Sequence, residues 1–571
     1  MIILGLNHGE INSSAAIVKD GKLTAGGPEE RFSREKLTKK FPAQSIQYCL
    51  QAENIQLQDC DFIAQAWNPM ASQNKFSPYI SGLRTSNIRE DYYYGLTDNL
   101  FNITKRNPQD WVLIDYPRET GLPPIYYVQH HRTHAAASFF LSPFEEAAIL
   151  TADFRGELES VTMGMGRDNK LNLIKKLELP HSLGMFYAAF TELLGYKPDS
   201  DEWKVMALSA YDIDCEKEYN VIRPTIKLKD DGMFEMDLNF YQGVMDLQPG
   251  IYSPKLKDAL GGRVGKKGEE PDEWHIRIAK AMQKVSEEIA VHMLNHLHSV
   301  TGSDNVVVGG GFFMNSVFNG RITNLTKFKN VYIPYAPTDA GNSIGAAFYV
   351  AHQLKNEPRV KVDYPSSIGP SYSNDQIEEV LHRRKIPYTK CENMAKSVAE
   401  VLAQGKVVAF FNGRMEFGDR ALGCRSILGD PRKPEMKDII NGVIKYREAY
   451  RPFAPSILAE RVYEYFEVDK DFTCNYMEKV VPFREHKKKE VPAVVHFDGS
   501  GRVQTVSKTT NPDYYNVIAE FEKITGVPIV LNTSFNINGE PIVLSPDDAL
   551  NTFFNSGIEH LFLSGYHIKK A

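Results

Sequence analysis

Cysteine is scarce in this chain, since only six cysteines are scattered among its 571 residues. No two of them form a CxxC pair, which excludes a cysteine zinc site and any disulfide framework that spacing could reveal. Isolated thiols are typical of proteins that stay in a reducing compartment. We therefore expect a cytoplasmic protein.

Secretion and membrane signals are also missing. The opening residues, MIILGLNHGE, lack the basic region and long apolar stretch of a secretory signal. No window reaches the ~18 uninterrupted apolar residues that a membrane helix requires. These absences support a cytoplasmic location and predict no membrane partner.

A strong charge of one sign is the third absence. The formal net charge is −6, from 66 basic and 72 acidic residues that are spread along the chain. The one short basic run, HKKKE at residues 486–490, is more simply explained as a solvated loop than as a phosphate track. Without a broad basic surface, we expect no nucleic-acid partner.

The length of the chain exceeds what one hydrophobic core supports, so several domains are expected. Strand-like and helix-like segments alternate along the chain, which predicts an α/β fold. A polar stretch with three prolines indicates a linker at residues 355–374. We predict one domain at residues 1–354 and another at residues 375–571.

Local patterns predict several elements. Apolar runs at residues 2–6, 15–18 and 23–25 predict a hairpin at the start of the first domain. Helices are expected at residues 42–52, 130–141 and 272–300, and a second hairpin at residues 161–177. We expect the Tyr-, Asn- and Arg-rich residues 68–122 to form an irregular insertion at a substrate entrance, where Tyr92, Tyr93 and Tyr94 are candidates to stack on an acceptor.

The first group of candidate functional residues contains two histidines and two aspartates. His130 and His134 are four apart on a predicted helix, so they share one face with Cβ atoms ~5–6 Å apart. Asp153 ends a buried strand, and Asp339 lies in a turn before a helix. Imidazole and carboxylate ligands suit divalent transition metals. Helix capping or burial in the core is the alternative, and spacing alone does not connect Asp339 to the histidines. His131 is rotated by ~100° and is expected to point elsewhere.

Two glycine-rich turns form the second group. Residues 309–311 and 341–345 each follow a predicted strand, and such turns let backbone N–H groups approach a phosphate. Glycine turns after strands are also common without a ligand.

The third group is a cationic cluster in the second domain. Arginine guanidinium groups match the oxygens of phosphates and carboxylates, so the cluster indicates a small polyanionic ligand. Surface ion pairs with Glu416, Asp419, Asp430 and Glu448 are the alternative. The cluster and the polar residues that follow it are Arg420, Arg425, Lys445, Arg447, Arg451, Arg502, Asn532 and Ser534.

Nearly the whole chain resembles the NodU/CmcH family of O-carbamoyltransferases. The segments that carry the resemblance are EERFSREK, HHRTHAAASFF, HSLGMFYAAFTELLGYKP, EWKVMAL, GGGFFMNSVFNGRI, PTDAGNSIGAA, GRMEFGDRALGCRSIL and REAYRPFAPSILAE. The resemblance implies a duplicated N-terminal domain of the actin/hexokinase/Hsp70 superfamily and a C-terminal YrdC-like α/β domain. It also implies that the C-terminal domain makes carbamoyl adenylate from carbamoyl phosphate and Mg²⁺-ATP. The N-terminal domain would then transfer the carbamoyl group to a hydroxyl of a small natural-product or sugar-like acceptor, using Fe(II) or another divalent transition metal.

The resemblance also assigns roles to individual residues. The metal ligands would be His130, His134, Asp153 and Asp339, and the catalytic residues His130, His134, Arg420, Lys445 and Arg451. Carbamoyl phosphate and nucleotide would contact Arg420, Lys445, Arg447, Arg451, Arg502, Asn532 and Ser534 in the C-terminal domain. Nucleotide contacts in the N-terminal domain would come from Lys204, Gly310, Asn315 and Asn342. A homodimer is a family-based expectation.

The chain departs from the family at one motif. Where the family carries His-Asp-Ala-Ser, this sequence has Ile11 and Asn12 in the first two positions. A neutral amide cannot accept a proton as a carboxylate does, so the base that would assist the acceptor is uncertain at this position. His8, Glu10 and Asn12 are the candidates, and a solvated turn is the alternative. Two other functions also remain open: a small-metabolite kinase on the same fold, and a binding or assembly protein without activity.

Overall fold

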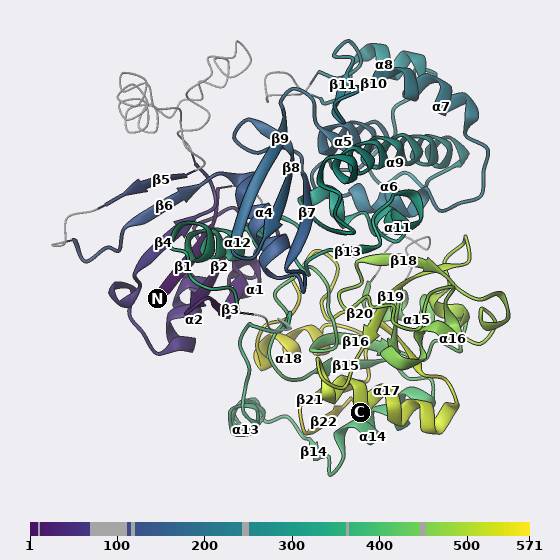
Figure 1. Cartoon of the computed structure of the whole chain (residues 1–571). Coiled ribbons are helices and arrows are strands. Elements are labelled where there is room, and N and C mark those ends of the chain that lie inside the picture. The colour runs from purple at the N-terminus through teal and green to yellow at the C-terminus, as the bar shows by residue number, and fades with distance from the viewer. Residues whose placement is uncertain are drawn as a thin grey trace. The chain divides into compact units, whose positions relative to one another are not determined.

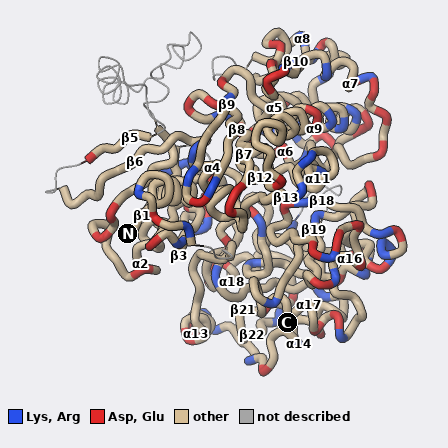
Figure 2. The backbone as a smooth tube through the Cα atoms, in the orientation of Figure 1, with Lys and Arg blue, Asp and Glu red and all other residues tan. Residues whose placement is uncertain are grey.

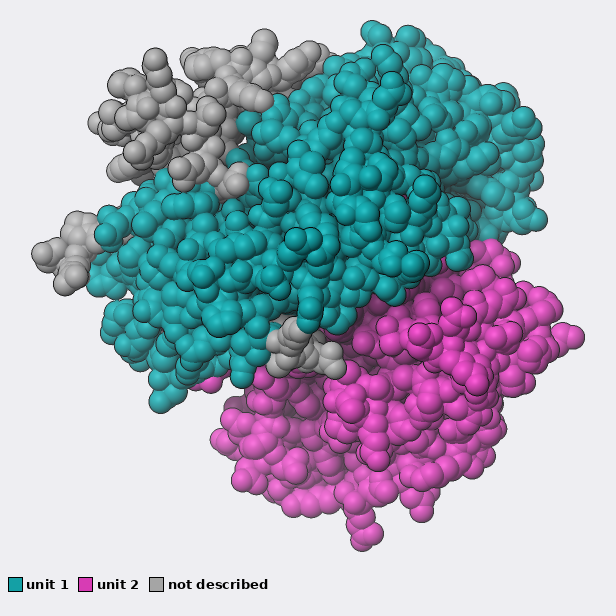
Figure 3. Space-filling model, in the orientation of Figure 1, with its two compact units in different colours: residues 1–24, 53–315, 321–362 teal, residues 25–52, 316–320, 363–571 magenta. Residues whose placement is uncertain are grey.

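The computed structural model describes residues 1–9, 12–68, 111–115, 120–242, 250–360, 365–445 and 453–570. It contains two compact units (Figure 3). Unit 1 comprises residues 1–24, 53–315 and 321–362, and unit 2 comprises residues 25–52, 316–320 and 363–571. Glu10, Arg447, Arg451 and the tyrosines at 92–94 lie outside the described residues.

The first sheet of the chain has six strands in the order β3-β2-β1-β4-β6-β5 (Figure 1). β1 pairs with β2 in antiparallel register, whereas β1, β4 and β6 run parallel to one another. The side chains of β1 and β2 are almost all buried, as expected for strands covered on both faces. The strands are β1 (Ile2–Asn7), β2 (Ser14–Lys19), β3 (Lys22–Pro28), β4 (Phe62–Gln65), β5 (Trp111–Ile114) and β6 (Ile125–Val128).

The second sheet has the same order for five of its strands. Its order is β13-β12-β7-β8-β9, in which β7, β8 and β9 are successive antiparallel strands and β12 and β13 run parallel to β7. Apart from the additional antiparallel strand β5, the two sheets correspond in strand order, as expected for a duplicated α/β domain of the actin/hexokinase/Hsp70 type. The strands are β7 (Glu146–Ala152), β8 (Glu159–Arg167), β9 (Lys170–Glu178), β12 (Asn305–Gly309) and β13 (Asn330–Tyr332), with a separate ribbon of β10 (Ile226–Leu228) and β11 (Phe234–Met236).

Helices α4 and α12 pack against each other, and α12 also packs on β1 and β2. The close approach depends on glycine, because a Cβ at Gly345 would lie 1.9 Å from the carbonyl oxygen of Thr133 on α4. The helices of unit 1 are α4 (His130–Phe140), α5 (Leu183–Leu193), α6 (Glu202–Leu208), α7 (Glu216–Ile222), α8 (Pro254–Ala259), α9 (Glu273–Thr301), α11 (Ile322–Leu325) and α12 (Asn342–Phe348).

Unit 2 is built on a nine-stranded mixed sheet in the order β14-β22-β21-β15-β16-β20-β17-β19-β18. The strands are β14 (Thr389–Lys390), β15 (Val408–Phe411), β16 (Arg425–Gly429), β17 (Ala454–Leu458), β18 (Lys479–Pro482), β19 (Ser500–Val506), β20 (Ile529–Ser534), β21 (His560–Leu563) and β22 (Tyr566–Lys569). The helices are α1 (Glu29–Ser33), α2 (Ala43–Glu53), α10 (Ser316–Asn319), α13 (Asn374–Arg383), α14 (Met394–Ala403), α15 (Met436–Ile440), α16 (Val462–Tyr465), α17 (Pro512–Thr525) and α18 (Pro546–Phe554).

An early segment of the chain, residues 25–52, belongs to unit 2. Arg31 donates to the carbonyl of Gly418, and Arg34 donates to the carbonyl of Ile542. Tyr48 donates to the carbonyl of Ile368. Each compact unit therefore consists of several segments of the chain, whereas the predicted domains, 1–354 and 375–571, were continuous. The predicted domain boundaries stay a prediction.

Most local expectations from the sequence are confirmed. The two hairpins form, and the helices expected at residues 42–52, 130–141 and 272–300 are α2, α4 and α9. One expectation is wrong in part, because residues 111–114 of the supposed irregular insertion form β5, which pairs with β6. None of the described helices is long and apolar enough to cross a membrane. Figure 2 shows both signs of charge interspersed along the described backbone of each unit.

Replacing Gly345 by alanine should force α12 away from α4, because the new methyl group would overlap a backbone oxygen. Overpacking of this kind costs about 1–3 kcal/mol, so we expect a lower melting temperature by circular dichroism. The matched control is Gly442→Ala, since a Cβ there meets nothing within 4 Å. A Gly345→Ala protein that melts with the wild type would contradict the tight contact.

Candidate functional site

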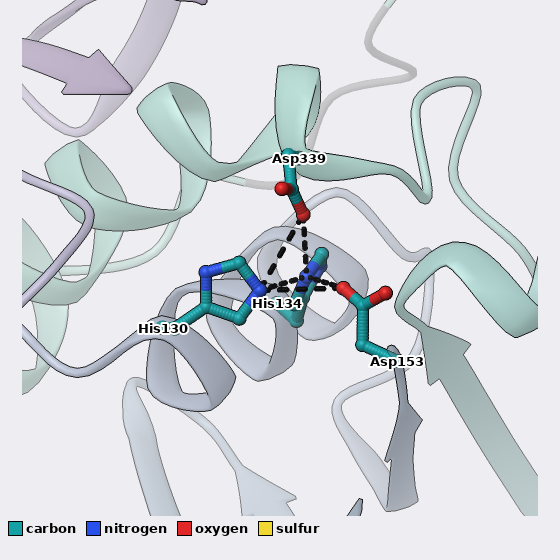
Figure 4. A group of neighbouring side chains, drawn as sticks. All are labelled: His130, His134, Asp153 and Asp339. Atoms are coloured by element: carbon teal, nitrogen blue, oxygen red, sulfur yellow. Dashed lines mark hydrogen bonds and ion pairs between the residues drawn. The ribbon is translucent and has the colours of Figure 1, made fainter. Parts of the chain in front are cut away.

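Three segments of unit 1 converge on one point (Figure 4). His130 and His134 lie on successive turns of α4, and Asp153 directly follows the buried strand β7. Asp339 opens the short turn that leads into α12. The potential ligand atoms of the four side chains all lie within 4.8 Å of one another. The structure therefore joins Asp339 to the histidines, which spacing alone did not.

The distances within this cluster are short. The Nε2 atoms of His130 and His134 are 3.0 Å apart, and Asp153 Oδ2 lies 3.2 and 2.8 Å from them, respectively. Asp339 Oδ1 lies 3.4 Å from both Nε2 atoms. Both histidines and Asp153 are buried, while Asp339 is partly exposed. Four potential metal-ligand atoms thus face a shared centre.

The electrostatics of the cluster fit a divalent cation. Burial alone would raise the pKa of Asp153, but hydrogen bonds from both histidines hold that pKa well below its usual range. Burial lowers the pKa of His130, yet the charge of Asp339 and the hydrogen bond to Asp153 outweigh it and leave the pKa raised. Two carboxylates and two imidazole nitrogens form a donor set that suits divalent transition metals. The described residues therefore fit a metal site, and they do not select one metal.

His131 points away from the centre, as expected from its rotation around the helix. Its Nδ1 lies 2.7 Å from Thr151 Oγ1, and Thr151 in turn contacts Thr162 Oγ1 at 2.6 Å. These contacts fix the ring against β7 and β8. His131 therefore belongs to the packing of α4 on the sheet.

Both ends of α4 are held by charged side chains that the sequence analysis missed. The carboxylate of Glu157 accepts the backbone N–H of His130, with 3.0 and 3.1 Å to its two oxygens, and the backbone N–H of Asn68 at 2.7 Å. At the other end, Arg359 donates to backbone carbonyls, including that of Phe139 at 2.7 Å. A negative charge at the N-terminus and a positive charge at the C-terminus both stabilise a helix. Burial raises the pKa of Glu157 to about 7.

No sequence signal that we used could have found these two residues, because each lies far from the helix end it contacts. Glu157 is 27 residues after His130, in the loop between β7 and β8. Arg359 follows α12 by several residues and lies in the stretch that resembled a linker. The contacts depend on tertiary structure alone.

The residues expected to contact nucleotide in unit 1 lie in three different settings. Gly310 adopts φ +96, and a Cβ there would lie 2.2 Å from the carbonyl oxygen of Ala152, so the glycine turn packs directly beside Asp153. The side-chain amides of Asn315 and Gln283 of α9 donate hydrogen bonds to each other. Lys204 Nζ lies 3.3 Å from Asp201 Oδ2. Asn342 lies against the histidines. Their role in nucleotide binding stays a prediction.

The candidates for an acceptor-side base lie near the start of unit 1. His8 is half-buried, and burial lowers its pKa. Asn12 is buried with φ +62, a conformation that asparagine tolerates better than most residues. Ser14 of the same motif donates to the carbonyl of Ala340 at 2.7 Å and contacts Ser343 at 2.8 Å. The motif is thereby anchored to the turn that carries Asp339, although the choice of base stays a prediction.

In unit 2, Lys445 is 3% exposed and is surrounded by oxygen atoms. Its Nζ donates to the carbonyl and hydroxyl of Ser534 at 2.6 and 3.3 Å. It also donates to the carbonyl and side chain of Asn536 at 3.0 and 2.9 Å. Two of the predicted donor-site residues, Lys445 and Ser534, are therefore in direct contact.

Asn532 connects further predicted residues. Its side-chain nitrogen donates to the carbonyl of Ala421, next to Arg420, and to the side chain of Gln504, both at 3.1 Å. Arg502 lies two positions before Gln504 on β19, so both side chains emerge from one face of that strand. Burial lowers the pKa of Arg420, as expected for a cation inside a folded unit. Asn532 and Ser534 are two positions apart on β20, so their contacts lie along one strand. Their role in binding a substrate, with Arg420 and Arg502, stays a prediction.

Arg425 is a correction to the cationic cluster, because its charge is already satisfied by the protein. It is fully buried, stacks on Phe411 with 3.6 Å from its guanidinium carbon to the ring centroid, and donates to five backbone carbonyls. Nearby, one oxygen of Glu416 accepts the backbone N–H groups of Leu422, Cys424 and Arg425. These two residues shape the loop that carries Arg420. Glu416 was expected only as a surface ion-pair partner of the cluster.

The fold and the site together define a class: a two-unit α/β protein in which a duplicated domain carries a buried histidine–aspartate cluster. Residues 2–348 match the family described as Carbamoyltransferase N-terminus, and residues 399–570 match Carbamoyltransferase C-terminus. The chain belongs to the carbamoyltransferase family.

The chain is also similar to several curated proteins. The nodulation protein NolNO of Sinorhizobium fredii is 34% identical over 98% of this chain and 79% of its own length. Nodulation protein U of Rhizobium fredii is 34% identical over 48% of this chain and 44% of its own length. An uncharacterized Synechocystis protein, sll1178, is 36% identical over 100% of this chain and 97% of its own length.

A solved structure of full-length HypF with phosphate and nucleotide aligns with a TM-score of 0.31 and 13% identity, over 62% of this chain and 55% of that chain. The fold assignment above depends on the strand order of the chain itself.

Replacing Glu157 by alanine should leave the His130 N–H without its acceptor and loosen the first turn of α4. Loss of a helix cap costs about 0.5–2 kcal/mol, and supporting residues of this kind typically contribute ~10-fold or more to metal affinity. We expect a lower melting temperature and a weaker Co(II) affinity by titration. Glu146→Ala is the control, because it removes only an exposed ion pair with Arg167. Equal Co(II) affinities of the two variants would count against this role of Glu157.

Arg425 and Arg420 should respond differently to substitution by lysine. Lysine cannot reproduce the fork of donors of Arg425, so several buried carbonyls would lose their partner and stability should fall by at least ~2 kcal/mol. Arg420→Lys should keep the melting temperature and raise the KM for the substrate that the family resemblance assigns to this residue. Thermal melts and initial rates of both variants check this contrast, which fails if Arg425→Lys is as stable as Arg420→Lys.

Proposed function

We propose that the protein is an ATP-dependent O-carbamoyltransferase that uses carbamoyl phosphate as its donor. Family membership supports carbamoyl transfer, and the observation that carries the proposal is the presence of two chemically different sites. Unit 1 has a buried histidine–aspartate cluster, and unit 2 has a buried Lys445 in contact with Ser534 and an Asn532 that contacts the backbone next to Arg420. The site in unit 2 suits a carbamoyl donor that carries several negative charges. The cluster in unit 1 suits a metal ion that acts as a Lewis acid.

The donor reaction is assigned to unit 2, which the family resemblance likens to YrdC. Water cleaves carbamoyl phosphate into carbamate and inorganic phosphate. An oxygen of the carbamate then forms a bond to the α-phosphorus of Mg²⁺-ATP, the bond from that phosphorus to the bridging oxygen breaks, and pyrophosphate leaves. Bringing two anions together requires cations that offset their repulsion and stabilise the charge of the transition state. Arg420, Lys445 and Arg502 serve this role, together with Arg447 and Arg451, which lie outside the described residues. Asn532 and Ser534 position oxygen atoms of the reactants.

Transfer to the acceptor is assigned to unit 1. His130, His134, Asp153 and Asp339 would hold a divalent transition metal such as Fe(II), which supplies Lewis acidity toward a carbonyl or phosphate oxygen when bound. The acceptor oxygen forms a bond to the carbamoyl carbon, the bond to the adenylate oxygen breaks, and AMP leaves. The hydroxyl proton passes to a base, for which His8 is the described candidate that carries an imidazole. The acceptor is a small hydroxyl-bearing molecule.

The two half-reactions should separate by mutation. His134→Ala removes one ligand from the unit 1 cluster, so we expect full loss of carbamoyl transfer with pyrophosphate release retained. Arg420→Ala should abolish carbamoyl-phosphate-dependent pyrophosphate release as well as transfer. Pyrophosphate and AMP are measured with and without a panel of hydroxyl acceptors.

The nucleotide product distinguishes carbamoyl transfer from the two alternative functions, a small-metabolite kinase and a protein without enzymatic activity. Release of ADP in the presence of an acceptor, without a requirement for carbamoyl phosphate, would identify a kinase instead. Absence of any carbamoyl-phosphate-dependent pyrophosphate from the wild type would identify a protein without this activity. Equal loss of both half-reactions in His134→Ala would refute the division of labour between the units.

A further inference from the structure

Asn342, the first residue of α12, faces the histidines of the cluster from a fully buried position. Its Nδ2 lies 3.2 Å from His134 Nε2 and 3.5 Å from His130 Nδ1. The family resemblance placed this residue near a nucleotide. The contacts place its amide at the edge of the histidine–aspartate cluster.

The other end of the amide has an unusual environment. Asn342 Oδ1 is buried and accepts no hydrogen bond from any residue that the structure describes. Buried amide oxygens in folded proteins nearly always have a partner, because an unsatisfied one loses its hydration without replacement. This oxygen is therefore available to a ligand that is not part of the chain.

The surroundings of His134 suggest what that partner is. Its Nε2 already faces His130 Nε2 at 3.0 Å and Asp153 Oδ2 at 2.8 Å. A histidine that binds a metal through Nε2 has no lone pair left for an amide N–H. Rotation by 180° about the last side-chain bond of Asn342 exchanges its nitrogen and oxygen, and then the oxygen faces the cluster.

The backbone of Asn342 is held in place while the amide turns. α12 contacts α4 through Gly345, and a Cβ at Gly5 of β1 would lie 1.9 Å from the carbonyl oxygen of Ser343. Ser343 is also bonded to Ser14 of β2 at 2.8 Å. Side-chain rotation is thus the motion available to this residue.

We propose that Asn342 is a fifth protein ligand of the metal in unit 1, through its side-chain oxygen. An amide oxygen is a neutral ligand for divalent cations. It therefore leaves the net charge of the site unchanged, with two carboxylates that neutralise one M²⁺. The inference rests on the metal centre of the proposed function.

The test compares Asn342→Leu, which has the same shape without polar atoms, with Asn342→Asp, which keeps an oxygen donor. Co(II) is titrated into metal-free protein, and affinity and visible absorption are measured. We expect Asn342→Leu to bind Co(II) at least ~10-fold more weakly, with stronger visible absorption because the coordination number falls. Asn342→Asp should retain binding within a few-fold.

Stability without metal provides an independent readout. Replacing an unsatisfied oxygen by an apolar group of the same shape is neutral or stabilising. Metal-free Asn342→Leu should therefore melt at or above the wild-type temperature, yet gain less from added Co(II). Asn305→Ala is the matched control, because this asparagine lies at the far end of β12 and donates to the carbonyl of Glu146. Its Co(II) affinity should equal that of the wild type.

Each result decides between specific alternatives. Wild-type Co(II) affinity and absorption in Asn342→Leu would overturn the inference and leave the four-residue centre intact. Unchanged metal affinity with weaker ATP binding would assign Asn342 to the nucleotide instead. If the wild type binds no Co(II), or binds it equally without His134, the metal centre of the proposed function fails as well. If Asn342→Leu does not fold, the Co(II) spectra of the wild type and of Asn342→Asp decide. Strong visible absorption in both, as expected for a low coordination number, would overturn the inference.

Discussion

Two imidazole nitrogens that lie 3.0 Å apart in a buried site impose the main constraint on unit 1. A contact this short fits either a hydrogen bond between the two rings or a shared cation, and the two carboxylates beside them stabilise positive charge in both cases. The packing of α4 on α12, the glycine turn against Asp153 and the charged contacts at both ends of α4 keep the four side chains together. The cluster therefore depends on contacts between segments of unit 1 that are distant in the sequence.

Unit 2 places its cations in a different way. Arg425 and Lys445 are both buried and both surrounded by neutral oxygens, but they differ in what those contacts require. Arg425 has five backbone carbonyls and an aromatic ring, so its contacts form part of the fold. Lys445 contacts Ser534, the last residue of β20 and one that was itself expected to bind substrate, and also Asn536 just after that strand. A similar degree of burial therefore accompanies a structural role in one residue and a proposed substrate role in the other.

Local sequence patterns predicted the α/β class and the elements with strong periodicity, whereas the duplicated first domain was expected only from the family resemblance. His130 and His134 were identifiable because helical periodicity alone places them on one face. Asp339 was connected to them only through the family resemblance, since 205 positions of chain separate it from His134 and no local rule spans that distance. Glu157, Arg359 and the partner-free oxygen of Asn342 were not predictable, because their contacts arise only when distant segments meet. β5 was missed because four apolar residues in a polar stretch give a weak signal.

The assignment of residues 25–52 to unit 2 has a consequence for how the protein is made. This segment leaves the ribosome early, but the residues that it contacts, such as Gly418 and Ile542, are synthesised last. Arg31, which is buried in the folded protein, cannot form its contact with Gly418 until that residue has been synthesised. Unit 2 can therefore fold completely only late in translation, although its first helices are made early.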